Sequence, residues 1–263
     1  MQQARGYQLK YSELNPEMHS ELSRRRKAAT MLAVLGESMG SRLGGCDVLN
    51  LGCSTGLIDE QLAPFVRSVM GVDIDEPGIL AARRRTTGRA NIEFMIADAM
   101  DLPFPENSFD VVICSQVYEH VPNAARMMAE VHRVLRTGGA CYFAATNRWS
   151  LIEQHYHLPF LSWLPIPLAS AYLRALGRSD AYYERHLGVP GLRKLTQPMR
   201  IEDWTGRILA HPERYGAEYM FPTRAKRLVS KLVYDWAYYL FPGFIWLLWK
   251  QDVPAADGPG NKR

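Results

Sequence analysis

The stretch "CDVLNLGCSTGLIDEQLAPFV", residues 46–66, decides the fold. Its first six residues are mostly apolar and predict a buried β-strand, whereas the residues after Gly56 predict a helix. The loop between them contains Gly52 and Gly56, which permit unusual backbone dihedral angles and close approach of a ligand. A strand, a glycine loop and a helix in this order suggest a site for a nucleotide or nucleoside.

The same alternation continues downstream. We expect strands at residues 68–73, 92–97, 109–114 and 140–146, and helices at residues 76–86 and 123–136. Strands alternating with helices of ten to fifteen residues indicate an α/β fold with a doubly wound, mostly parallel sheet. Because such sheets bind ligands beyond the carboxyl ends of their strands, we expect the chemistry in the loops that follow the strands: residues 50–56, 73–77, 98–101 and 114–122.

The composition is that of a globular protein with a sizeable core. The chain has 263 residues, 47% hydrophobic and 22% charged, with a net charge of +4. The first 30 residues lack the apolar stretch of a signal peptide, and the four cysteines lack a metal-binding spacing, so we expect reduced thiols and a cytoplasmic location. The basic runs at residues 24–27 and 83–85 are predicted to lie on solvated helix faces.

Residues 148–190 interrupt the regular pattern with many aromatic residues, prolines and histidines. A long irregular insertion beside a binding edge is more often a lid or a substrate wall than a linker. The alternative, that these aromatic side chains pack against one another as core, remains open. We predict the following organisation: an N-terminal helical segment at 1–45, a cofactor-binding core at 46–147, the lid or substrate insertion at 148–190, a C-terminal part completing the sheet at 191–250 and a disordered tail at 251–263.

The last hydrophobic stretch of the chain is "LVYDWAYYLFPGFIWLLW", residues 232–249. It contains Asp235 and is broken by Pro242 and Gly243, which argues against a membrane-spanning helix. We predict a helix that ends near Phe241, followed by a short buried strand. Its tryptophan and tyrosine residues leave a peripheral membrane contact open.

Two acidic residues follow predicted strands at the binding edge. Asp73 ends the second strand, where a carboxylate can accept hydrogen bonds from both hydroxyls of a ribose; a helix-capping role is the alternative. Asp98 ends the third strand and can accept from an exocyclic amine such as that of adenine.

With these elements in place, "VLNLGCSTG…GVDID…IADAMDLPFPENSFDVVICSQVYEHVPN…EVHRVLRTGG" resembles the class I S-adenosylmethionine-dependent methyltransferases over residues 46–146. The similarity is greatest to the small-molecule branch that includes quinone-biosynthesis enzymes. The resemblance implies a Rossmann-like, seven-stranded sheet with a helical, aromatic-rich insertion after the fifth strand. It also implies S-adenosyl-L-methionine as cofactor, bound by Asn50, Gly52, Cys53, Ser54, Gly56, Asp73, Ile74, Asp98, Ala99, Ser115 and Gln116.

The roles of these residues are also implied by the resemblance. The loop from Gly52 to Gly56 would face the methionine part, Asp73 the ribose, and Ile74, Asp98 and Ala99 the adenine, with Ser115 and Gln116 near the sulfonium. Asn50 stands where the family usually has an acid, and Ser54 stands in place of a glycine. Because asparagine still accepts a hydrogen bond and serine tolerates many turn geometries, we expect weakened rather than abolished cofactor binding.

His120, in "YEHVP", is the first candidate for a catalytic base because it follows the fourth strand, beside the expected methyl group. A structural histidine is the alternative, and Tyr118 is the second catalytic candidate. The insertion histidines His155, His157 and His186 rank lower. The "HYH" motif hints at metal ligands, but without a carboxylate at a suitable spacing we predict no metal.

We predict methyl transfer to a small, lipophilic or natural-product acceptor, with O-methylation favoured over N- or C-methylation. The residues "CSQVYEH" differ from the asparagine- or aspartate-proline-proline-aromatic signature of the nucleic-acid enzymes, so we expect no nucleic-acid partner. Two alternatives remain: a cofactor-binding protein of the same fold with lost or altered chemistry, and a membrane-peripheral enzyme acting on a lipid or glycolipid. The sequence does not determine the oligomeric state.

Overall fold

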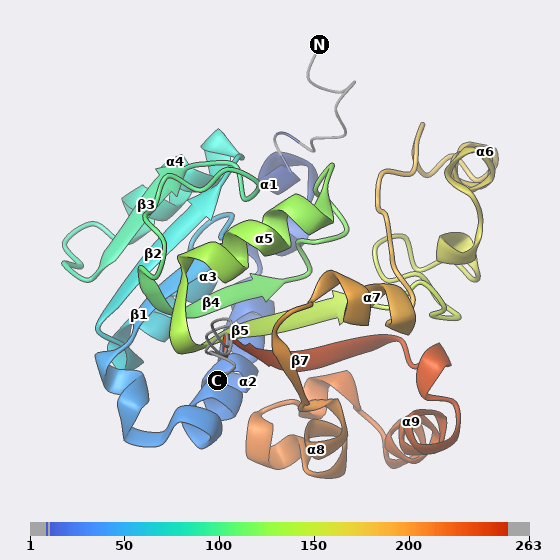
Figure 1. Ribbon diagram of the computed structural model, residues 1–263. Helices are drawn as coiled ribbons and strands as arrows, with labels where there is room; N and C mark the ends of the chain where they lie inside the picture. Colours follow the sequence, from blue (N-terminus) through green and yellow to red (C-terminus); the bar gives the residue numbers. More distant parts are fainter. Residues whose placement is uncertain (1–8, 10, 252–263) are drawn as a thin grey trace, which may run out of the picture.

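A seven-stranded sheet organises the chain in the computed structural model, which describes residues 9 and 11–251 (Figure 1). The strand order is β3-β2-β1-β4-β5-β7-β6, and β7 runs antiparallel to both neighbours, whereas the first five strands are parallel. The predicted doubly wound, mostly parallel α/β fold is therefore confirmed. The strands are β1 (Asp47–Leu51), β2 (Ser68–Asp73), β3 (Ile92–Ile96), β4 (Phe109–Ser115), β5 (Leu135–Thr146), β6 (Arg200–Asp203) and β7 (Gly243–Trp249).

Helices cover both faces of this sheet. The described α-helices are α1 (Tyr11–Leu14), α2 (Glu21–Met39), α3 (Leu57–Leu62), α4 (Glu76–Arg85), α5 (Ala124–Val134), α6 (Ile166–Ala175), α7 (Val189–Leu195), α8 (Thr205–Ala210) and α9 (Arg224–Trp236). Shorter 3₁₀ turns occur at Pro16–His19, Gly40–Gly45, Ala63–Phe65, Leu161–Trp163, Pro212–Tyr215, Glu218–Met220 and Tyr238–Leu240.

Two hydrophobic clusters, one on each face, hold these layers together. On one face, α5 and α7 contribute Met127, Val131 and Leu192 to a core with the strands. On the other face, α2, α3, α4 and α8 pack against the sheet, with Leu35 and Ile79 among the buried side chains. The central strands are covered on both sides, which explains why "FDVVIC" reads as a continuous apolar run.

The fifth strand is longer than predicted. Helix α5 ends at Val134, and β5 begins at the next residue and includes Gly138 and Gly139, which lie between the helix predicted at 123–136 and the strand predicted at 140–146. Gly138 N–H donates to Lys250 O (2.8 Å) and Lys250 N–H donates to Gly139 O (3.0 Å), so pairing with the end of β7 extends the strand. Hydrogen bonds between residues more than a hundred positions apart therefore extend β5 through two glycines that, by local sequence alone, favour a break.

The apolar C-terminal stretch divides as predicted into a helix and a strand. Helix α9 ends at Trp236, a 3₁₀ turn follows at Tyr238–Leu240, and β7 begins at Gly243. Among the described residues, no helix is long and apolar enough to cross a bilayer. The predicted tail lies, from residue 252 onward, outside the described residues.

Candidate active site

A cavity of about 930 Å³ lies at the carboxyl ends of the strands, where the fold predicts a ligand. Figure 1 shows the insertion that contains α6 beyond the arrowheads of β4 and β5, on this side of the sheet. The cavity lining includes these residues that were predicted to form the site: Gly52, Ser54, Asp73, Ile74, Asp98, Ala99, Ser115, Gln116 and His120. They come from four loops that are separated in the sequence and meet at one edge of the sheet.

The glycine loop after β1 adopts a left-handed backbone at alternate positions. The φ angles are +67° at Gly52, +50° at Ser54 and +72° at Gly56. A Cβ atom on Gly52 would lie 2.9 Å from a methyl group of Val117, so the chain passes too close here for a side chain. Ser54 tolerates the left-handed conformation, and its hydroxyl oxygen is buried without a hydrogen-bond partner. The loop therefore presents backbone and one unsatisfied polar atom to the cavity wall.

Asp73, at the end of β2, both braces this loop and lines the cavity. Its Oδ2 accepts a hydrogen bond from the Ser54 N–H (2.8 Å), and its Oδ1 accepts one from the Asp75 N–H (3.0 Å). Burial raises the pKa of the carboxyl group, and these two donated hydrogen bonds oppose that shift. The carboxylate is thus held in one orientation before any ligand arrives.

Asp98 stabilises the loop after β3 through contacts within that loop. Asp98 Oδ1 accepts a hydrogen bond from the Met100 N–H (2.8 Å), and Asp98 pairs with Asp101 in an isolated bridge. Ala99 lies between them at the cavity, and Ile74 faces it from the loop after β2. An acid and two apolar side chains there form a surface suited to a flat ring with an exocyclic amine.

Three residues that were predicted to bind the cofactor hold the glycine loop in place from the side away from the cavity. Asn50 is buried and its Nδ2 donates to Asp59 Oδ2 on α3 (2.9 Å). Cys53 is buried, and its N–H and that of Gly52 donate to Val72 O at 3.1 and 2.9 Å. Gly56 begins α3 as its N-terminal cap, against Phe94.

Tyr118 lies in the core and not at the cavity. Its hydroxyl donates to Thr146 O (2.6 Å) and accepts from the Leu187 N–H (3.1 Å), while its ring packs against Phe143. The side chain therefore ties the end of β5 to the end of the insertion. Two backbone groups engage the hydroxyl, and Tyr118 is not among the residues that line the cavity.

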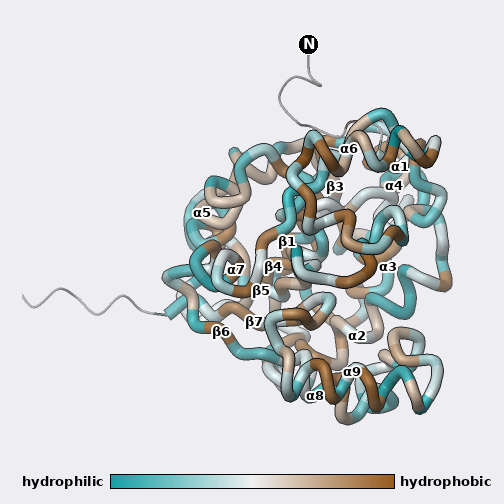
Figure 2. The backbone as a smooth tube through the Cα atoms, turned by 90° about the vertical axis from the view of Figure 1, so that its right-hand side faces the viewer, coloured by the Kyte–Doolittle hydropathy of each residue, from teal (hydrophilic) through white to brown (hydrophobic). Residues whose placement is uncertain are grey.

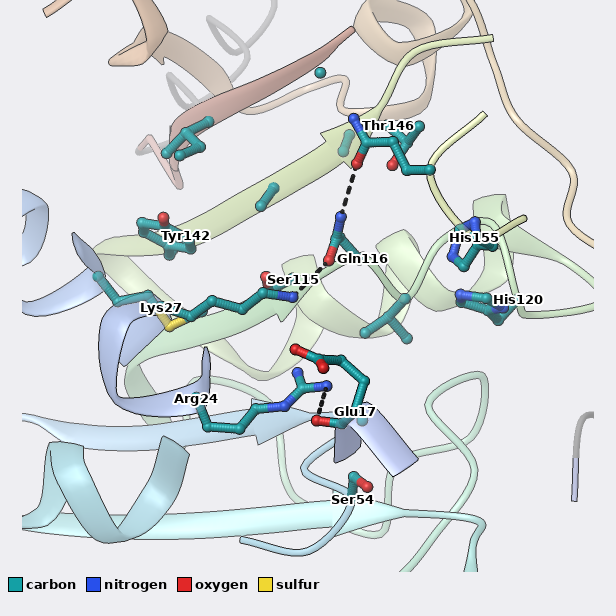
Figure 3. Close-up of a pocket in the computed structure, with 18 of the residues that line it drawn as sticks. Glu17, Arg24, Lys27, Ser54, Ser115, Gln116, His120, Tyr142, Thr146 and His155 are labelled. Carbon is teal, nitrogen blue, oxygen red and sulfur yellow. Dashed lines mark hydrogen bonds between the residues drawn. The ribbon is translucent and has the colours of Figure 1, made fainter. Parts of the chain in front are cut away.

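His120 faces the cavity from the loop after β4. Its ring lies 5.3 Å from that of Tyr11 and 5.0 Å from that of His155. Figure 3 shows the rings of His120 and His155 next to each other. Burial, together with the neighbouring imidazoles of His155 and His186, lowers the pKa of His120 to about 3. The ring is therefore neutral near pH 7 and can accept a hydrogen bond.

The N-terminal segment supplies cavity residues that the sequence analysis missed. Tyr11, Arg24 and Lys27 all line the cavity, and Lys27 Nζ donates to Gln116 Oε1 (3.1 Å; Figure 3). Burial lowers the pKa of Lys27 to about 8. The prediction of a solvated basic face is wrong for Arg24 and Lys27, which are three residues apart on one side of α2. Their spacing in the sequence indicates that both side chains lie on one face of a helix. No local sequence pattern, however, shows that this face borders the cavity.

The walls of the cavity differ from those predicted. The insertion contributes Gln154, His155 and His157, whereas Tyr156 and Tyr182 pack in a separate small core around α6. The aromatic lining comes from other segments: Tyr11, Tyr142, Tyr219, Phe221, Phe241 and Phe244. Four of these, Tyr219, Phe221, Phe241 and Phe244, lie in residues 191–250, which we predicted only to complete the sheet.

The central part of the chain is similar to known methyltransferases. A family model described as a methyltransferase domain matches residues 49–143. A probable S-adenosylmethionine-dependent methyltransferase of Mycolicibacterium smegmatis is 34% identical over 115 residues, which cover 44% of this chain and 44% of that protein. A ubiquinone biosynthesis O-methyltransferase of Pseudomonas syringae is 33% identical over 111 residues, 41% of this chain and 47% of that protein. The chain thus spans about half the length of the curated relatives it matches.

Solved structures agree with the fold over most of the chain. An S-adenosylmethionine-dependent methyltransferase from Mesorhizobium loti superposes with a TM-score of 0.53 at 19% identity, covering 81% of this chain and 94% of that one. At this identity the likeness concerns the fold alone. The superposition covers a larger share of the chain than residues 49–143, which the family model matches.

Proposed function

We propose that this protein transfers a methyl group from S-adenosylmethionine to a small acceptor, with a hydroxyl oxygen as the favoured nucleophile; the match of residues 49–143 to a methyltransferase domain and the similarity to S-adenosylmethionine-dependent methyltransferases support this. One observation carries the proposal. One cavity is lined by two sets of residues: the glycine loop, Asp73 and Asp98 form one, and Tyr11, His120 and His155 form the other. Figure 3 shows Ser54 of the glycine loop apart from His120 and His155. The first set suits the cofactor and the second suits an acceptor.

The residues at the cofactor end fit S-adenosylmethionine. The unpartnered hydroxyl of Ser54 and the close-packed Gly52 form a cradle beside Asp73, whose carboxylate would hold the ribose hydroxyls. Asp98 and Ile74 would bind the adenine. When bound, this cofactor supplies an electrophilic methyl group on a sulfonium. The cavity volume, about 930 Å³, also leaves room for an acceptor.

The acceptor end provides positioning, exclusion of water and a hydrogen-bond acceptor. Neutral His120 accepts a hydrogen bond from the nucleophile and so orients it; because burial lowers its pKa to about 3, its imidazole is a weak base, and orientation is its main contribution. Phe221, Phe241 and Phe244 supply apolar surface, in keeping with a lipophilic acceptor. Holding the nucleophile in line in an enclosed site is the main contribution expected for this reaction.

Incubation with methyl-labelled cofactor and a panel of phenolic, quinone, polyketide and glycolipid acceptors tests the proposal. We expect transfer to at least one acceptor class, and we expect the His120→Ala variant to be slowed about 10²-fold at nearly unchanged cofactor affinity, because the nucleophile loses the hydrogen bond that orients it. The exposed His211 is the control, since its replacement by alanine should leave the rate unchanged. Tight cofactor binding without transfer to any acceptor would favour the alternative, a cofactor-binding protein with lost or altered chemistry.

A second candidate, a membrane-peripheral enzyme acting on a lipid-linked acceptor, is favoured by the surface of α9. None of the side chains of this helix is buried. Leu228, Leu232 and Trp236 form an apolar stripe with 61%, 51% and 86% exposure, and the helix also carries Arg224 and Lys226. Figure 2 shows α9 and α6 at opposite ends of one face of the molecule. Because Lys226 and Ser230 of α9 also line the cavity, this helix borders the site, with the apolar stripe on the helix face turned away from the cavity.

Vesicle flotation distinguishes the two candidates. We expect the protein to bind vesicles rich in anionic phosphatidylglycerol and a Leu232→Ser/Trp236→Ser variant to lose that binding while keeping its thermal stability. Leu80→Ser is the matched control, an exposed leucine on α4. Equal flotation of both variants and the parent would exclude a role for the stripe.

A further inference from the structure

Three histidines and three glutamates gather beside the cavity, at the base of the insertion. They come from three segments of the chain: Glu119 and His120 after β4, Glu153 and His155 early in the insertion, and Glu184 and His186 at its end. All three carboxyl groups are buried, with residue exposures of 0%, 0% and 4%. Burial of several carboxylates in one place requires compensating positive charge or protons.

Glu153 stands at the centre of this cluster. Its Oε1 lies 2.7 Å from His155 Nδ1 and 3.3 Å from His186 Nε2. Its Oε2 accepts hydrogen bonds from the N–H groups of His155 and Tyr156, at 2.8 and 2.7 Å. The carboxylate is therefore held by the backbone with one oxygen aimed between two imidazoles, whose rings stack 5.7 Å apart.

Two neighbouring groups are buried without a hydrogen-bond partner. Both carboxyl oxygens of Glu119 are unsatisfied, and so is Nδ1 of His186. A Glu119 oxygen and ring nitrogens of His120 and His155 all lie within 4.8 Å of one another. A second carboxylate thus points at His155 from a different element of the fold. An unsatisfied buried carboxyl group of this kind is costly, and a bound cation would satisfy it.

We propose that this cluster binds one divalent transition-metal ion, with Zn²⁺ best suited, through Glu153, His155 and His186. Two imidazoles and one carboxylate form a donor set that zinc sites use when a further coordination position stays open. The three ligand atoms lie within 4.8 Å of one another. In tetrahedral zinc, ligand atoms are about 3.3 Å apart, as implied by bonds of about 2.0–2.1 Å. The observed separations of 2.7 and 3.3 Å from Glu153 Oε1 need only a small adjustment.

The ion would lie at the wall of the cavity, since His155 also lines that cavity. Glu119 would supply the remaining negative charge near the open position. A Lewis acid in this place would bind an oxygen of the acceptor, and that role rests on the proposed function. Binding of the ion does not depend on it.

Titration of untagged, chelator-treated protein with ZnCl₂, followed by calorimetry, tests the site. We expect one ion per chain, and affinity lowered at least about 100-fold in Glu153→Gln and His186→Ala. His157→Ala is the matched control because His157 shares the insertion loop and lines the cavity but lies outside the ligand set. The alternative, a network in which Glu153 accepts hydrogen bonds from both histidines, predicts no stoichiometric binding.

Substitution with Co²⁺ provides a measurement that needs no variant. The parent protein should develop the intense visible absorption bands of four-coordinate cobalt, so the site remains testable even if His186→Ala does not fold. Absence of these bands, or equal loss of affinity in His186→Ala and His157→Ala, would overturn the proposal. Chelator-treated protein that binds no ion yet still transfers methyl groups would overturn the ion site and leave the proposed function standing.

Discussion

Asn50, at the start of the glycine loop, is hydrogen-bonded to a buried acid on α3, Asp59. Asn50 stands where the resemblance implies an acid, and we expected the loss of that charge to weaken cofactor binding. In the structure, Asn50 donates to Asp59 on α3, so a carboxylate is present nine positions later, behind the loop. Asp59 is fully buried, and its second oxygen lacks a hydrogen-bond partner. Burial raises the pKa of Asp59 to about 7.

This raised pKa predicts that stability falls as pH rises. The unfolded chain releases the Asp59 proton near pH 4, whereas the folded chain keeps it until about pH 7, so the free energy of unfolding decreases between these limits and levels off above them. Asp59→Asn should remove this dependence, with a gain of up to about 4 kcal/mol at pH 8 and little gain at pH 4.5. Urea unfolding of both proteins at the two pH values measures the difference. An equal effect of the substitution at both values would contradict the raised pKa.

Asp73 leads to a prediction about ligand affinity. Asp73→Asn keeps the shape of the side chain but replaces one acceptor oxygen with a donor and removes the charge that would hold the ribose hydroxyls. We expect S-adenosylhomocysteine to bind about 10- to 150-fold more weakly, because the substitution removes one hydrogen bond to a charged group, which contributes about 1.5–3 kcal/mol. Calorimetry gives the affinities. Asp101→Asn, at an exposed acid of the same edge, is the control, and unchanged affinity in Asp73→Asn would show that the ribose lies elsewhere.

At the scale of elements, the junction of β1 and α3 depends on Gly56. Its φ is +72°, and an added Cβ would lie 2.7 Å from the Phe94 ring and 2.8 Å from the Ala82 Cβ. Gly88 has a similar φ of +85° but open space around it. Comparing a substitution at Gly56 with one at Gly88 therefore separates the energetic cost of backbone strain from that of steric crowding.

We expect Gly88→Ala to cost about 1 kcal/mol, the penalty of a left-handed backbone. Gly56→Ala should cost that amount plus about 1–3 kcal/mol for overpacking between the loop, α4 and β3. Denaturant unfolding measures both, and cofactor affinity should fall only in Gly56→Ala. Equal losses of stability in the two variants would mean that the packing relaxes without cost.

Most elements of the sheet were predictable because each strand carries its own apolar pattern. The second strand matches the prediction residue for residue, and the third and fourth differ by one residue at their ends. The start of β5 and the end of α9 were not predicted correctly. Local residues favour a stop at Gly138, but the partner strand β7 supplies hydrogen bonds that continue the ladder.

At the scale of the whole molecule, β7 closes the core from the far end of the chain. It lies between β5 and β6, and Trp246, Leu247 and Leu248 are almost completely buried. A chain ending at residue 242 should therefore lose cooperative unfolding, since an open strand edge and a large apolar surface would remain. A chain ending at residue 251 retains every described element and should fold. Near-ultraviolet circular dichroism and thermal melting compare the two, and a cooperative melt of the shorter chain would contradict the prediction.

The sequence by itself determined the fold class, the order of most elements and the group of loops that meet at the binding edge. These features follow from short-range patterns: apolar strands, glycines at a turn, and acids at strand ends. Only the tertiary structure decided that Lys27 reaches the cavity, that Tyr118 does not, and that Glu119, Glu153 and His186 converge on His155. The physical reason is that these contacts join segments with no local pattern in common, and their partners are set by how the helices and the insertion pack on the sheet.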